Sequence, residues 1–188
     1  MKTYVISAFT CCGKSYFAEK YKDEYDILDL KLIDFKLIKR KRTEEELKRK
    51  AELWDSEPHL MPSEKYINLI KDDLICINNE NYMDDFIKTI KSNLGKMHFI
   101  FVDYDLEASK ALEEHNIDYI TILPKNNLLC EWIGRVYFKY GTYKLKLLEY
   151  NWEHLKNIES ETHGKNIIYL NSNEYIENAI NNIFNCIL

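Results

Sequence analysis

Short apolar runs alternate along the chain with longer segments in which apolar residues recur at helical spacing. The runs have the length of β-strands, and they are Tyr4–Ala8, Tyr25–Leu30, Met97–Val102, Tyr119–Leu123 and Asn166–Leu170. The periodic segments predict helices at Tyr16–Tyr21, Lys31–Trp54, Glu64–Ile77, Asp84–Leu94, Leu106–His115, Leu128–Tyr140, Lys144–Ile158 and Glu174–Leu188. Strands that alternate with helices in this way are typical of an α/β fold with a parallel sheet.

A phosphate-binding motif stands where the first strand meets the first helix. Residues Ala8–Ser15 read Ala-Phe-Thr-Cys-Cys-Gly-Lys-Ser, which matches the phosphate loop except that Ala8 replaces its first glycine. Backbone N–H groups of such a loop point at phosphate oxygens, and the N-terminus of the following helix favours negative charge. The motif predicts an ATP site whose binding residues are Phe9, Thr10, Cys11, Cys12, Gly13, Lys14, Ser15 and Tyr16.

Individual side chains near this motif have expected roles. Lys14 should reach the β- and γ-phosphates, and the Ser15 hydroxyl should bind Mg²⁺. Asp103 ends the apolar strand before it, and a carboxylate at such a strand end can hold Mg²⁺ through water. Asp105 follows closely and has two interpretations, as part of the acceptor side or as the cap of the helix beginning at Leu106. The expected ligands are therefore ATP and Mg²⁺.

Composition narrows the class of protein. A chain of 188 residues fits one domain, and 46% hydrophobic with 30% charged residues excludes a disordered chain. The net charge of −5 argues against a dedicated nucleic-acid binder, although local basic clusters could contact phosphates. No apolar run approaches the ~20 residues needed to span a bilayer. Five cysteines without metal or disulfide spacing predict a reducing, cytoplasmic location.

With the phosphate loop, the order of segments resembles the nucleoside monophosphate kinase-like P-loop family, in particular small phage-type nucleotide kinases. The resemblance covers about Tyr4 to Trp152, through SAFTCCGKSYFAEKY, YDILDL, EPHLMPSEKYINLI, HFIFVDYD, IDYITILP, LLCEWIGRVYFKYG and YNW. It implies a P-loop NTPase three-layer sandwich, a five-stranded parallel sheet of order 2-3-1-4-5 with helices on both faces. It also implies one domain over 1–188, with a helical acceptor-binding insertion at about 31–95 and a lid at about 126–145.

The resemblance also implies roles for single residues. Asp29 matches the first carboxylate of the acceptor side, and Pro58 and Pro62 fall in a segment near the acceptor site. Arg135 and Lys139 match the basic positions of the lid helix and act with Lys14 in catalysis. Their spacing of four places both on one helix face, where cations can close over the γ-phosphate.

Departures from the family cluster on the acceptor side. Leu30 and Lys31 follow Asp29 where a second carboxylate is usual, and Ser109-Lys110 replaces the usual acceptor-phosphate arginine. The sequence thus predicts an ATP-dependent phosphotransferase, a nucleoside or deoxynucleoside monophosphate kinase whose partner is a small nucleotide-like acceptor. Two alternatives stay open, a degenerate non-catalytic nucleotide-binding protein and a polynucleotide 5′-end kinase that uses Lys39–Arg42. A homodimer is also left open. If a phage encodes the chain, the expected location is the cytoplasm of its host.

Overall fold

The computed structural model describes residues 1–49, 74–161 and 166–185. The chain forms two compact units, residues 1–32 with 83–188 and residues 33–82. The first unit contains a five-stranded sheet in which every pair of neighbouring strands is parallel. In spatial order its strands are β2 (Ile27–Leu30), β5 (Phe99–Asp103), β1 (Tyr4–Ala8), β6 (Tyr119–Pro124) and β7 (Ile167–Leu170). When only the five strands of this sheet are numbered in chain order, the spatial order is 2-3-1-4-5. The predicted α/β fold and topology are therefore confirmed.

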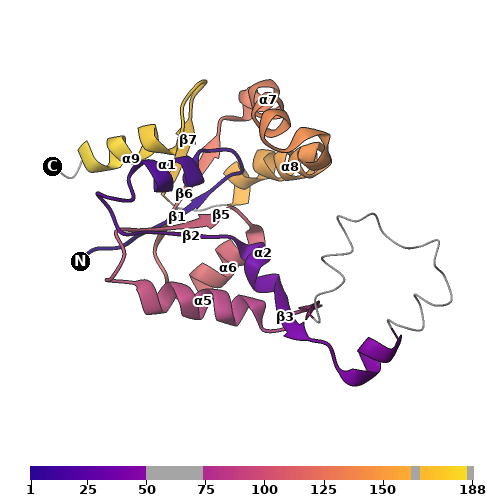
Figure 1. Ribbon diagram of the computed structural model, residues 1–188. Helices are drawn as coiled ribbons and strands as arrows, with labels where there is room; N and C mark the ends of the chain where they lie inside the picture. Colours follow the sequence, from indigo (N-terminus) through magenta and orange to yellow (C-terminus); the bar gives the residue numbers. More distant parts are fainter. Residues whose placement is uncertain (50–73, 162–165, 186–188) are drawn as a thin grey trace. The chain divides into compact units, whose positions relative to one another are not determined.

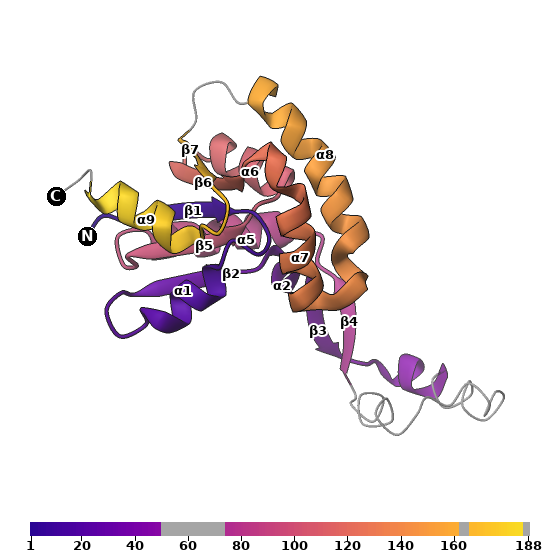
Figure 2. The same cartoon turned by 90° about the horizontal axis from the view of Figure 1, so that it is seen from above.

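Helices lie on both faces of this sheet (Figure 1). One face carries α1 (Lys14–Lys20) and α9 (Ile176–Asn185), and the opposite face carries α5 (Tyr82–Asn93) and α6 (Leu106–Glu114). After β6, a 3₁₀ turn at Asn126–Leu128 leads into α7 (Leu129–Tyr140), and a second turn at Gly141–Lys144 connects α7 to α8 (Leu145–Glu161), as Figure 2 shows. None of the helices in the described ranges is both long and apolar enough to cross a membrane.

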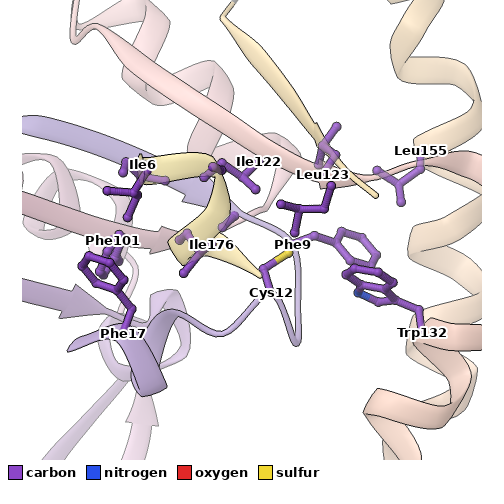
Figure 3. Close-up of a cluster of buried hydrophobic side chains, with 14 of the residues drawn as sticks. Ile6, Phe9, Cys12, Phe17, Phe101, Ile122, Leu123, Trp132, Leu155 and Ile176 are labelled. Atoms are coloured by element: carbon purple, nitrogen blue, oxygen red, sulfur yellow. The ribbon is translucent and has the colours of Figure 1, made fainter. Parts of the chain in front are cut away.

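The central strands β5, β1 and β6 are mostly apolar because helices bury them from both sides. Their side chains are fully buried at Ile6, Ile100, Phe101, Val102, Ile122 and Leu123. Figure 3 shows that Phe9 and Cys12, two residues of the phosphate loop, belong to the same cluster as Trp132 of α7. The loop is therefore anchored in the core rather than lying loosely over it.

The second unit departs from the sequence-based expectation. After α2 (Leu32–Lys36), residues Leu37–Lys41 form β3, which pairs antiparallel with β4 (Leu74–Asn78). The predicted helices at Lys31–Trp54 and Glu64–Ile77 are therefore wrong where these strands lie. Ile38 stands opposite Ile77, and such cross-strand contacts override the local helical periodicity of the sequence. Residues 50–73, which include Pro58 and Pro62 and much of the predicted insertion at about 31–95, lie outside the described ranges.

A new helical segment begins after β3, and a capping box explains its start. The Thr43 hydroxyl accepts a hydrogen bond from the Glu46 N–H, and the Glu46 carboxylate accepts one from the Thr43 N–H at 2.8 Å. Residues 44–49 are helical. The sequence run Thr-Glu-Glu-Glu, interpreted above as the middle of a long helix, is thus the start of a separate one.

Candidate functional site

The phosphate loop lies at the point where the sheet changes direction. From β1 the chain passes through α1 to β2 on one side, and from β5 it passes through α6 to β6 on the other. Because α1 and α6 cover opposite faces (Figure 1), the carboxyl ends of the neighbouring strands β1 and β5 form a topological switch point of the sheet. Open α/β sheets bind their ligands at such a switch point.

The loop is held from both sides by hydrogen bonds to its backbone. The indole N–H of Trp132 donates to the Thr10 carbonyl at 2.9 Å. The Ile176 N–H, at the start of α9, donates to the Cys12 carbonyl at 2.8 Å. The Phe9 N–H in turn donates to the neighbouring strand β6 at 3.0 Å. These contacts fix the path of the loop while leaving its N–H groups at the helix start free of intrahelical partners.

The turn into α1 needs a left-handed backbone. Gly13, the N-cap of α1, has φ of 95°, a value that favours glycine. A Cβ atom at this position would stand 3.2 Å from the ring of Tyr175. Cys11 also adopts a positive φ, 61°. The first N–H groups of α1, including those of Lys14 and Ser15, cannot bond within the helix, so they are available to an anion.

Lys14 is fixed at the mouth of the loop by two oxygen atoms. Its ammonium group donates to the Ala8 carbonyl at 3.0 Å and pairs with Asp103 Oδ1 at 2.9 Å. The Lys14 side chain is only 9% exposed, whereas that of Asp103 is 45% exposed. Asp103 stands directly across from Ala8 in the β1–β5 register, which explains why it reaches this lysine.

Ser15 contacts the other predicted carboxylate. Its hydroxyl donates to Asp29 Oδ2 at 3.0 Å. The second oxygen of Asp29, Oδ1, is buried and has no hydrogen-bond partner among the described residues. An unsatisfied buried carboxylate oxygen is costly unless a cation or donor meets it. The structure thus brings Asp29 to Ser15 and Asp103 to Lys14, whereas the sequence grouped Asp103 with Ser15 and put Asp29 on the acceptor side.

Arg135 of the predicted lid helix has partners within the fold. Its guanidinium lies between two rings, with its Cζ atom 4.1 Å from the ring centroids of both Trp132 and Tyr175. It also donates to the Glu174 carbonyl at 3.0 Å and forms an ion pair with Glu131. With a side chain 10% exposed, Arg135 joins α7 to the segment that precedes α9.

Glu131 extends this connection. Its carboxylate accepts the Ser172 hydroxyl at 2.8 Å and the Asn173 N–H at 3.0 Å. Burial alone would raise the pKa of Glu131, but the bonds from Ser172, Asn173 and Arg135 lower it below the usual value. Sequence reasoning missed Glu131 and Tyr175. The Glu-x3-Arg spacing on one helix was a signal for Glu131, whereas Tyr175 had none in the local sequence.

The remaining predicted residues lie apart from this group. Lys139 is exposed, and its ammonium lies 5.2 Å from the Tyr140 ring centroid. Asp105 is the N-cap of α6, since its Oδ1 accepts the N–H groups of Glu107 and Ala108. The capping interpretation of Asp105 therefore describes its observed contacts.

The two loop cysteines differ in environment. Cys12 is 1% exposed, and burial raises the pKa of its thiol to about 12. It remains neutral at physiological pH and packs like a small hydrophobic residue. Cys11 is half-buried, and the Thr10 hydroxyl lies 3.9 Å from its sulfur. Cys12 therefore fills space beneath the loop.

A prediction follows for Arg135. Arg135→Ala removes both ring contacts and the Glu131 pair, so the variant should lose about 2 kcal/mol of unfolding free energy. For a chain of this length that loss corresponds to a fall in Tm of about 4–8 °C, measurable by circular dichroism. Lys139→Ala, on the same helix but exposed, should leave Tm unchanged. An unchanged Tm for Arg135→Ala would contradict a structural role.

Comparisons with known proteins add little to this geometry. No protein-family model matches the chain, and no curated protein matches it. Among solved structures, the crystal structure of TT1252 from Thermus thermophilus is similar, at 15% sequence identity and a TM-score of 0.44. That match covers 100% of this chain and 98% of the other. A likeness this distant carries no argument about function.

Proposed function

We propose that this protein is an ATP-dependent phosphotransferase that moves the γ-phosphate of ATP to a small nucleotide-like acceptor, as a nucleoside or deoxynucleoside monophosphate kinase does. One observation carries the proposal. The lysine of the phosphate-loop motif is held at the carboxyl ends of β1 and β5 by the Ala8 carbonyl and Asp103, and Ser15, the next residue, is hydrogen-bonded to Asp29. Phosphoryl transfer asks mainly for positioned cations and oriented phosphates, and such an arrangement could supply both.

The residues at these strand ends offer oxygen atoms that suit a magnesium ion. Mg²⁺ prefers oxygen ligands and is usually held by one or two protein oxygens together with phosphates and waters. Ser15 Oγ and the unsatisfied Asp29 Oδ1 are the candidate oxygens. When bound, Mg²⁺ neutralises charge on the β- and γ-phosphates.

Lys14 would supply the second positive charge. Its stem is buried, so the ammonium has little freedom to move away from the loop. Asp103, which is half-exposed, can yield its place beside Lys14 to a phosphate oxygen, while the Ala8 carbonyl keeps the lysine oriented. A preorganised cation of this kind stabilises charge that develops in the transition state at little reorganisation cost.

A second candidate function is a nucleotide-binding module without turnover. The observation in its favour is that Arg135 is engaged by Glu131, Trp132 and Tyr175. A guanidinium used in this way stabilises the fold and is not held ready to close over a phosphate. Binding would then rest on the loop and Lys14 alone.

One assay separates the two functions. The protein is incubated with ATP-Mg²⁺ and, in turn, each nucleoside monophosphate, each deoxynucleoside monophosphate and a 5′-hydroxyl oligonucleotide, while ADP release is followed. ADP release that depends on a monophosphate acceptor supports the proposal. Saturable ATP binding without ADP release for any acceptor favours the binding module, and ADP release only with the oligonucleotide would replace the proposed acceptor with a polynucleotide end.

A further inference from the structure

The two-stranded ribbon of β3 and β4 has one completely exposed face. Side chains alternate between the faces of a strand, and the pairing register fixes which residues share a side. Figure 2 shows the two strands side by side. The exposed face, called here the ribbon face, contains Leu37, Lys39, Lys41, Leu74, Cys76 and Asn78, and all six residues are exposed. It contains two lysines and no carboxylate.

On the opposite face of the ribbon, the positive charge of Arg40 is paired with a carboxylate of the same unit. Arg40 donates two hydrogen bonds to the Glu46 carboxylate, at 2.8 and 2.7 Å. These bonds, together with the N–H of Thr43, lower the pKa of Glu46 to about 2. The Arg40–Glu46 pair connects β3 to the helical segment that follows it. Arg40 is therefore neutralised by the fold, and its role differs from that of its neighbours.

Lys39 and Lys41 have no such partner. Within the described ranges neither lysine forms an ion pair, and their positions two apart on a strand separate them by about 6.8 Å. Arg42 follows the end of β3, does not belong to the ribbon face, and has a buried Nε atom. Two unpaired cations, Lys39 and Lys41, thus lie side by side on the exposed face of an extended backbone.

We propose that the ribbon face binds the sugar–phosphate backbone of a single-stranded nucleic acid. Lys39 and Lys41 would contact successive phosphates. Leu37 and Leu74, 44% and 39% exposed, offer apolar surface beside the lysines on which sugars and bases can lie. The net charge of −5 confines favourable contact with a polyanion to local strips such as this one. The inference does not depend on the proposed phosphotransferase activity.

The test measures fluorescence anisotropy of fluorescein-labelled dT12 titrated with protein, without ATP, at several salt concentrations. The wild-type protein should bind with Kd in the range of about 10⁻⁴–10⁻⁶ M. Two phosphate contacts predict a slope of log K against log[salt] of about −1.4. Lys39→Gln with Lys41→Gln should weaken binding at least about tenfold and bring the slope close to zero. The matched control, Lys88→Gln with Lys96→Gln, removes two exposed lysines elsewhere and should bind as the wild type does.

Three outcomes would overturn the proposal. The first is that wild-type protein causes no anisotropy change at 50 mM salt, roughly the low-salt end of such titrations. The second is that the ribbon and control variants weaken binding equally. The third is that inorganic triphosphate, at an equal phosphate concentration, displaces dT12. The last result would indicate a site for small phosphates instead. Lys14→Ala serves to separate the two proposals, because it should leave dT12 binding intact whatever its effect on ATP turnover. Circular dichroism establishes that each variant is folded.

Discussion

Lys14→Ala should lower kcat by at least about 100- to 1,000-fold, the loss expected when one preorganised stabilising group is removed from a transition state. The ammonium of Lys14 is held by Ala8 and Asp103 at the strand ends where the phosphates would lie. In the proposed complex its removal would also leave the Asp103 carboxylate near the γ-phosphate without a neutralising charge. Electrostatic repulsion should then add to the loss of stabilisation.

The measurement is acceptor-dependent ADP release under saturating ATP-Mg²⁺, with Lys14→Met as a second variant that preserves the buried stem. Lys22→Ala is the matched control, since Lys22 is exposed and, within the part of the chain that the structure describes, pairs only with Glu19. A folded Lys14 variant with near wild-type kcat would reject the assignment of this loop to ATP. Loss of activity in the Lys22 variant as well would point to a general effect of charge.

The sheet was predictable because its signals are local and redundant. Each strand of the first unit is a short apolar run, and β5 consists of four fully buried residues followed by an aspartate. Gly13 and Lys14 marked the passage from strand to helix. The strand order followed from the resemblance once Asp103 was placed beside the loop. Burial on both faces leaves few alternatives for segments of this kind.

The ribbon of the second unit was missed for the opposite reason. The segment Leu37–Lys41 has only two apolar residues and lies among charged side chains that suit an exposed helix equally well. Its strand conformation depends on β4, more than thirty residues later in the chain. A contact so distant in sequence leaves no trace in local periodicity.

For the candidate site, the sequence indicated which residues lie together but not how they pair. Lys14, Ser15, Asp29 and Asp103 lie at or next to the carboxyl ends of their strands, and their roles in binding and catalysis stay predictions. Which carboxylate meets which side chain depends on register, and the register placed Asp103 opposite Ala8. Arg135 illustrates another limit, because a basic residue on a helix gives no sequence sign of the rings that enclose it.

The pairing of Ser15 with Asp29 leads to the second large effect. Asp29→Asn should lower kcat by about 10- to 100-fold or more and raise the Mg²⁺ concentration needed for half-maximal activity. Asparagine can still accept the Ser15 hydroxyl, so the variant should fold, but it removes the negative charge whose Oδ1 is unsatisfied. At saturating Mg²⁺ the KM for ATP should change little, because the loop and Lys14 remain.

The experiment titrates Mg²⁺ at fixed ATP and acceptor, and then the acceptor at saturating Mg²⁺. Asp23→Asn, an exposed aspartate between α1 and β2, is the control and should behave as the wild type does. The resemblance to nucleotide kinases implies a different result, in which only the KM for the acceptor rises and the Mg²⁺ requirement is unchanged. That result would return Asp29 to the acceptor side and leave Ser15 as the only side chain at the metal. A shift in the Mg²⁺ requirement would instead make Asp29 a residue of the metal side, because a carboxylate that acts only on the acceptor has no reason to change it.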